Sequence, residues 1–280
     1  MSKLYSSIQK AIEKSRLGQP AGSRARRDTR SAESGQEGKA GSAIFRIFQT
    51  ASPDKEIMEE NLIVSAIDDR SAIAAYSVLR TRVLQRMRNN GWHTLLVTSP
   101  GAGEGKTLTA LNLAVSLSRD VNQSVMLVDL DLQRFTVAKY FGFASEVKAG
   151  IGEYLMGSAE ITEIIYVPSN LERITVIPNR VAIENSSDLL ASPRMKELLA
   201  WLREQSDRTI IIFDMPPVLA CDDVLAFCPD VDSVLLVVAE GQTDRAALDK
   251  TMALLAETNL LGVVLNKSDE LGDSEAYGYY

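Results

Sequence analysis

A glycine-rich stretch, Ser99 to Thr107 with the sequence SPGAGEGKT, constrains the fold more than any other part of the chain. The apolar run before it, residues 94–98, predicts a buried strand, and residues 108–117 carry apolar residues at helical spacing. A strand, a glycine-rich turn, Lys-Thr and a helix form the arrangement of a phosphate-binding loop. Glycines let backbone N–H groups face an anion, and the helix N-terminus adds further unpaired N–H groups. The stretch therefore predicts a nucleotide site.

Within this loop, the Lys106 ammonium is expected to reach the outer phosphates and the Thr107 hydroxyl to bind Mg²⁺. The strict pattern has glycine at position 100, where this chain has Pro100. The alternative is an ordinary glycine-rich turn between a strand and a helix. The residues that we expect to contact the nucleotide are Gly101, Gly103, Glu104, Gly105, Lys106, Thr107 and Leu108.

Continuously apolar runs alternate with helical patterns along the rest of the chain. This alternation predicts an α/β fold with a mainly parallel central sheet flanked by helices on both faces, and together with the glycine-rich loop it predicts a P-loop NTPase. Ligands of such sheets bind at the carboxyl ends of the strands. The expected strands cover residues 94–98, 124–128, 173–177, 209–213, 233–239 and 260–266, and the expected helices cover 71–88, 108–117, 136–141, 192–205 and 243–258.

Carboxylates follow two of these strands directly. Asp214 ends the run 210–213, which is the position of a Walker B aspartate, and Asp129 and Asp131 end the run 125–128. A spacing of two in extended backbone places both side chains on the same side. One carboxylate of the pair can bind metal while the other accepts a hydroxyl proton. The alternative for all three is a helix cap or a solvated turn.

Charge and composition divide the chain of 280 residues unevenly. The net charge is −7, yet residues 1–52 carry ten Lys and Arg against four Asp and Glu. The acidic remainder argues against a nucleic-acid-binding core.

The apolar runs are too short to span a membrane, which predicts a cytoplasmic protein. We expect an amphipathic helix at 1–17, a flexible linker at 18–65, the P-loop domain at 66–268 and a tyrosine-rich tail at 269–280.

The run from Val125 to Arg134 resembles the Walker A′ motif of bacterial tyrosine kinases, the autokinases of capsule and exopolysaccharide synthesis. Residues 185–195, 213–219 and 262–266 are similar to further segments of that family, and the resemblance covers roughly residues 70–280. It implies an ATP-dependent protein-tyrosine autokinase that requires Mg²⁺. Lys106 would contact the phosphates and Thr107 the metal. Asp129 and Asp131 would serve the metal and the tyrosine hydroxyl, in either assignment.

The same resemblance implies that Asp214 supports the metal and that Asn266 reads the edge of the adenine. It also makes Tyr277, Tyr279 and Tyr280 the phosphoacceptors, modified between neighbouring copies. It further implies a membrane-bound polysaccharide co-polymerase, a chain-length determinant, as activator, with recruitment to the inner face of the membrane. It implies a homo-oligomer as well.

Two departures from the family pattern leave other functions open. Gln133 stands where the family has Arg, and Ala74, Ser77 and Arg80 stand at its Glu-x-x-Arg-x-x-Arg positions, which join subunits into a ring. The alternatives are a partitioning-type nucleotide-switch ATPase and a degenerate subunit that binds ATP without catalysis. The tyrosine tail and the Asp-x-Asp spacing favour the kinase.

Overall fold

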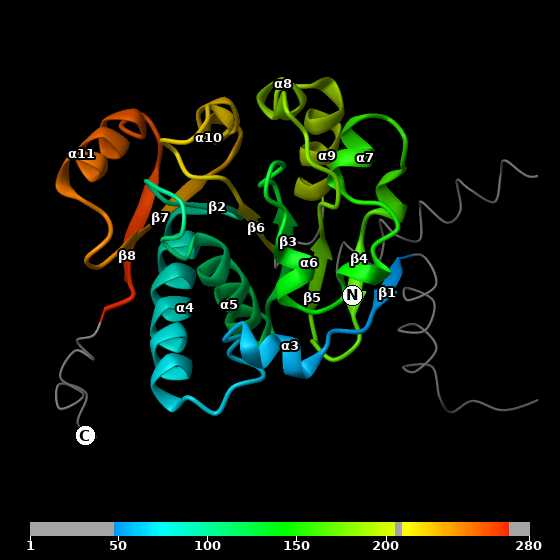
Figure 1. Ribbon diagram of the computed structural model, residues 1–280, viewed down its shortest axis with the longest axis horizontal. Helices are drawn as coiled ribbons and strands as arrows, with labels where there is room; N and C mark the ends of the chain where they lie inside the picture. The colour runs from blue at the N-terminus through cyan, green and yellow to red at the C-terminus, as the bar shows by residue number, and fades with distance from the viewer. Residues whose placement is uncertain (1–47, 205–208, 269–280) are drawn as a thin grey trace, which may run out of the picture.

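The computed structural model describes residues 48–204 and 209–268, and these form one mixed sheet between two layers of helices (Figure 1). The sheet order is β1-β4-β5-β3-β6-β2-β7-β8. Every neighbouring pair is parallel except β4 and β5, which are antiparallel. The strands are β1 (Gln49–Ala51), β2 (Thr94–Thr98), β3 (Ser124–Asp129), β4 (Tyr166–Pro168), β5 (Ile174–Ile177), β6 (Thr209–Asp214), β7 (Ser233–Ala239) and β8 (Leu260–Asn266).

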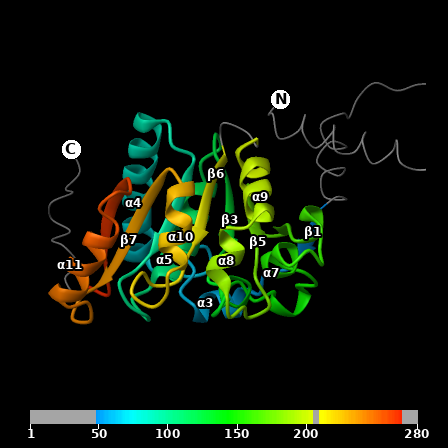
Figure 2. The same ribbon diagram turned by 90° about the horizontal axis from the view of Figure 1, so that it is seen from above.

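Helices cover both faces of this sheet, as Figure 2 shows from above. On one face α4 (Arg70–Asn90) and α5 (Lys106–Ser118) lie beside α3 (Lys55–Glu60) and α6 (Val137–Tyr140). On the other lie α7 (Ile151–Leu155), α8 (Ser186–Leu190), α9 (Pro193–Arg203), α10 (Asp223–Phe227) and α11 (Arg245–Leu254). The short 3₁₀ turns are Ala144–Glu146, Ile161–Glu163 and Cys228–Asp230.

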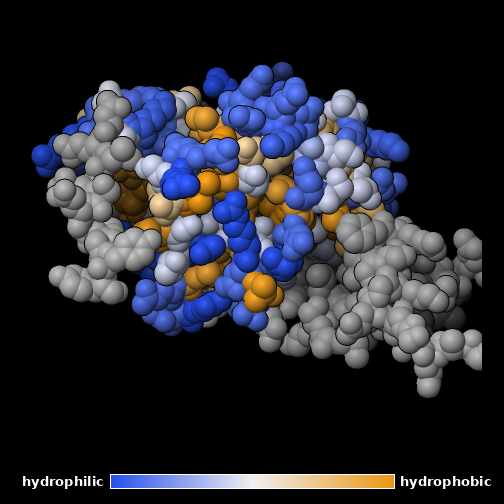
Figure 3. Space-filling view, turned by 90° about the horizontal axis from the view of Figure 1, so that it is seen from below, coloured by the Kyte–Doolittle hydropathy of each residue, from blue (hydrophilic) through white to orange (hydrophobic). Residues whose placement is uncertain are grey.

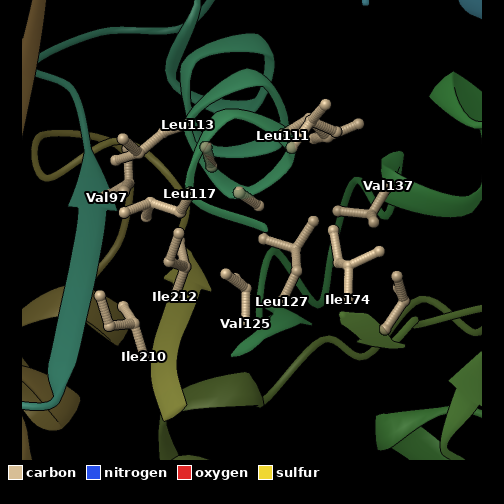
Figure 4. Close-up of a cluster of buried hydrophobic side chains, with 14 of the residues drawn as sticks. Val97, Leu111, Leu113, Leu117, Val125, Leu127, Val137, Ile174, Ile210 and Ile212 are labelled. Atoms are coloured by element: carbon tan, nitrogen blue, oxygen red, sulfur yellow. The ribbon is translucent and has the colours of Figure 1, made fainter. Parts of the chain in front are cut away.

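The central strands are buried on both faces because each helical layer packs a core against them. Every residue of β2, β6 and β7 is buried. Figure 4 shows one of the two cores, in which Leu113 and Leu117 of α5 lie by Val97 and Ile212, while Leu111 lies on the side of Val137. Burying each such side chain stabilises the fold by roughly 1.5–3 kcal/mol. The predicted α/β class, with its mainly parallel sheet and helices on both faces, is confirmed.

The prediction of a flexible linker up to residue 65 is wrong for the part that the structure describes. Residues 49–51 form β1, which pairs with β4, and residues 55–60 form α3. Asp54 caps α3 by accepting from the backbone N–H groups of Glu56 and Ile57. The Asn112 side chain of α5 binds the backbone of Leu62 and Val64. These long-range contacts order the described part of the segment. The predicted helix at 1–17 and tail at 269–280 lie outside the described residues.

The surface seen in Figure 3, on the side that lies at the bottom of Figure 1, shows apolar areas separated by hydrophilic side chains. In the described part of the chain, helices are either too short or too polar to cross a membrane.

Candidate active site

The glycine-rich loop connects β2 to α5 at the carboxyl edge of the sheet, where the prediction placed it. Gly105 caps α5 and has a φ of 93°, and Gly103 has a φ of 77°. Both values lie in the left-handed region that favours glycine. A Cβ atom on Gly105 would also collide with the amide nitrogen of Asn266. Glycine is therefore required at position 105 for two independent reasons.

Pro100 fits this loop, since its carbonyl takes part in the hydrogen bonds that join the loop to the segment after β6. Its carbonyl accepts from the N–H of Leu219 at 3.2 Å, and the Ser99 carbonyl accepts from the N–H of Val218 at 2.9 Å. These bonds join the start of the loop to the segment after β6. They bring the loop to the end of the strand that carries Asp214.

The Glu104 side chain holds the loop from inside, a role that the sequence did not predict. It is 3% exposed, and one carboxylate oxygen accepts from the Gly101 N–H at 2.9 Å. The other accepts from the Thr243 hydroxyl at 2.6 Å. Thr243 precedes α11 and carried no motif that would have singled it out. Leu108 lies in the first turn of α5 and packs against the core.

Three carboxylates and one ammonium meet beside this loop. Asp129 and Asp214 occupy paired positions at the ends of β3 and β6, and neither is exposed. Lys106 Nζ lies 2.8 Å from Asp131 Oδ2, 3.9 Å from Asp214 Oδ1 and 3.1 Å from the Thr107 hydroxyl. The structure thus brings together all the predicted catalytic residues.

Burial dominates the proton equilibria of this cluster. It raises the pKa of Asp129 well above the ordinary value, and the neighbouring Asp214 raises it further. It raises the pKa of Asp214 to about 6, against the attraction of Lys106. Burial lowers the pKa of Lys106, but Asp214 and Asp131 outweigh it, so that the pKa is raised overall. Lys106 therefore stays protonated. Its single positive charge does not neutralise the buried carboxylates around it.

The unpaired oxygens of this cluster fit a divalent cation. Asp129 Oδ1 and both carboxylate oxygens of Asp214 are buried without a hydrogen-bond partner. Asp129 Oδ2 is occupied, since it accepts from the N–H groups of Thr136 and Val137 at 3.1 Å each. Within residues 48–204 and 209–268 there is no set of three or more His, Cys, Asp or Glu arranged to enclose a metal. Mg²⁺ commonly uses one or two carboxylates and completes its shell with water and phosphate, which suits this donor set.

Asn266, predicted to read the adenine edge, lies in contact with the phosphate-binding loop. Its Nδ2 donates to the Glu104 carbonyl at 2.9 Å. Contact with adenine stays a prediction. The predicted acceptors Tyr277, Tyr279 and Tyr280 lie outside the described residues.

Comparison with known proteins places the chain in a family. The AAA domain family matches residues 94–268. The chain is 29% identical over 225 residues to the tyrosine-protein kinase YwqD of Bacillus subtilis, a match covering 80% of this chain and 92% of that protein. It is 29% identical to the putative tyrosine-protein kinase EpsB of Ralstonia nicotianae over 78% of this chain, but spans only 28% of EpsB.

A solved structure gives the same result. The kinase domain of the Escherichia coli tyrosine kinase Etk superposes with a TM-score of 0.65 at 28% identity. The match covers 74% of this chain and 80% of that one. The sequence comparison and the structural superposition therefore match the same group of proteins, the bacterial tyrosine kinases.

Proposed function

Because the chain belongs to the AAA domain family, and within it to the bacterial tyrosine kinases, we propose that it phosphorylates its own tyrosines. It transfers the γ-phosphoryl group of ATP, bound with Mg²⁺, to Tyr277, Tyr279 and Tyr280 of another copy. Protein-tyrosine kinase activity is what the names of the relatives state. The acceptor residues and the transfer between copies are this proposal's own content.

One observation carries the proposal: buried, unpaired carboxylate oxygens lie beside an ammonium at a phosphate-binding loop. Such oxygens are costly unless a cation joins them. Bound Mg²⁺ supplies charge stabilisation to the transferring phosphoryl group. Lys106 would turn from Asp131 to the phosphates, and Thr107 and Asp214 would hold the metal. Asp129 and Asp131 share the metal and the proton of the tyrosine hydroxyl between them.

The cellular role follows from the relatives and belongs to the proposal. We assign the kinase to exopolysaccharide or capsule synthesis, or to control of chain length. A membrane-bound polysaccharide co-polymerase is the proposed activator and recruits the kinase to the inner face of the membrane. Nucleic acid is not a proposed partner.

Assembly into a homo-oligomer needs contacts other than the arginine helix of the family. In α4, Ala74 is exposed and the Ser77 hydroxyl donates to the Ile73 carbonyl. Arg80 donates to the Ser116 carbonyl of its own chain at 3.2 Å. The one family residue retained here is thus bonded within the subunit.

Replacing Tyr277, Tyr279 and Tyr280 together by Phe tests the acceptor assignment. We expect phosphotyrosine to disappear from the chain, while the affinity for Mg-ATP stays within about twofold because the replaced hydroxyls are the acceptors and not part of the nucleotide site. Mass spectrometry after incubation with Mg-ATP and the activator measures the modification. Phosphotyrosine persisting elsewhere in the triple variant would contradict the assignment.

A nucleotide-switch ATPase is the second candidate, because the loop and the metal-binding carboxylates suit hydrolysis as well. It predicts ATP turnover without phosphotyrosine under activating conditions. A degenerate subunit, suggested by Gln133, predicts nucleotide binding with neither activity. The same incubation separates the three functions, since it measures ADP and phosphotyrosine together.

Gly105→Ala tests the geometry of the loop. The new methyl group collides with the Asn266 amide and needs a left-handed backbone. We expect affinity for Mg-ADP to fall at least about 10-fold, since the backbone strain alone is worth 1–2 kcal/mol. Gly91→Ala is the matched control, with a φ of 67°, open space around it and a place at the end of α4. It should lower stability and leave affinity unchanged. Equal affinities in the two variants would contradict this account.

A further inference from the structure

Three successive carbonyls of the phosphate-binding loop accept hydrogen bonds from side chains outside it. The Ala102 carbonyl accepts from Gln242 Nε2 at 2.9 Å, and the Gly103 carbonyl accepts from Lys267 Nζ at 2.7 Å. The Glu104 carbonyl accepts from Asn266 Nδ2, as described above. The donors come from two segments, the β7–α11 connection and the end of β8 with the residue after it.

We propose that Gln242 and Lys267 are positioning residues for nucleotide binding, which fix the loop so that its N–H groups face the phosphates. This inference rests on the proposed function. In a planar trans peptide the carbonyl and the next N–H point in opposite directions. Holding the carbonyls of residues 102–104 from outside therefore directs the N–H groups of residues 103–105 to the opposite side. That side is where an anion binds in a nest of backbone N–H groups.

Gln242 and Lys267 act as one unit. Lys267 Nζ also donates to Gln242 Oε1 at 2.9 Å, so that each side chain orients the other over the loop. Gln242 in turn lies beside Gly103, where an added Cβ would lie 3.4 Å from its Nε2. The pair therefore covers the outer surface of the most glycine-rich part of the loop.

The backbone of Lys267 supports a dedicated role. Its φ is 58°, in the left-handed region, which is unfavourable for a residue with a Cβ atom. The strand β8 ends one residue earlier, where the Asn266 carbonyl accepts from the N–H of Glu240 at 2.9 Å. This turn directs the Lys267 side chain to the loop. Both Lys267 and Gln242 are exposed, so that their hydrogen bonds contribute little to folding.

Lys267→Met tests the inference through nucleotide affinity. We expect the Kd for a fluorescent Mg-ADP analogue to rise about 3- to 10-fold, the range of one or two hydrogen bonds. Tripolyphosphate affinity should fall by a similar factor, since the phosphates and not the base are affected. The KM for ATP should rise while the KM for an acceptor peptide stays constant. The melting temperature should change by less than about 2 °C.

Four further variants complete the test. Lys267→Arg keeps charge and donors and should restore most of the affinity. Gln242→Ala should resemble Lys267→Met, and the double variant should lose little more than either, because the pair acts as a unit. Lys250→Met removes the same charge from an exposed position of α11 and should leave the Kd unchanged.

Two results would overturn the inference: an unchanged Kd in Lys267→Met and Gln242→Ala, or an equal rise in Lys250→Met, which would indicate a general charge effect. Both leave the proposed function intact. Failure of the wild-type protein to bind Mg-ADP would instead refute the proposed function together with this inference.

Discussion

Replacing Lys106 by Met is expected to abolish tyrosine phosphorylation, with a loss of about 10²- to 10³-fold or more. The ammonium is the only side-chain cation that the described residues place within 4 Å of Asp131 and Asp214. Removing one group that stabilises developing charge in a site without water typically lowers the rate by about 10²- to 10³-fold. The measurement is the initial rate of phosphotyrosine formation at saturating Mg-ATP. A rate within tenfold of the wild type would show that Lys106 does not contact the transferred phosphoryl group.

The same substitution is expected to destabilise the metal-free protein at neutral pH. Breaking a buried ion pair from one side costs about 3–5 kcal/mol, and Asp131 and Asp214 are both buried. Asp214 can relieve this in the variant by taking up a proton. Below the pKa of Asp214, about 6 in the wild type, the difference in stability should therefore shrink. Urea unfolding at pH 5 and pH 7.5 measures it, and a difference independent of pH would contradict the account.

Asp214→Asn is expected to stabilise the metal-free protein while removing its response to Mg²⁺. Burial raises the pKa of Asp214 from 3.8 to about 6. The folded state therefore holds a proton more tightly than the unfolded state. This contribution favours folding below about pH 4 and is lost as the pH rises to about 6. At pH 7 the ionised carboxylate thus costs of the order of 2–3 kcal/mol, and the neutral amide avoids that cost.

Unfolding of Asp214→Asn from pH 4 to pH 8 without metal gives the test. The gain over the wild type should be near zero at pH 4 and complete at pH 7. Added Mg-ADP should raise the melting temperature of the wild type and have little effect on the variant, because Asp214 supports the metal. Asp188→Asn, an exposed position in α8, is the matched control and should show neither effect. A variant that is less stable than the wild type at pH 7 would contradict the analysis of burial.

The sequence predicted the central part of the fold because its strands are continuously apolar. β2, β3, β6, β7 and β8 are runs of this kind, and the polar residues that follow them mark the carboxyl edge of the sheet. The two short strands at one end of the sheet, β1 and its neighbour β4, were not predicted. Each has three residues, and β1 pairs with a partner more than a hundred residues away. Local patterns carry no information on such pairing.

The residues of the candidate site also fall into those that the sequence predicted and those that it did not. Lys106, Asp129, Asp131 and Asp214 could be predicted because each follows an apolar run at a spacing with a chemical meaning. The residues that hold the loop could not, since Gln242, Thr243 and Lys267 are polar loop residues without a pattern. Only the folded chain shows that the Lys267 side chain reaches the Gly103 carbonyl, 164 positions away.

A mixture of two inactive variants tests the central claim most directly. Lys106→Met keeps the tail and lacks the phosphate contact, whereas the triple Phe variant of Tyr277, Tyr279 and Tyr280 keeps the site and lacks the acceptors. Each is incubated alone and then together with Mg-ATP and the activator, and phosphotyrosine is mapped by mass spectrometry. The account predicts phosphotyrosine on the tail of Lys106→Met in the mixture only. ATP hydrolysis by the mixture with no phosphotyrosine on that tail would contradict it.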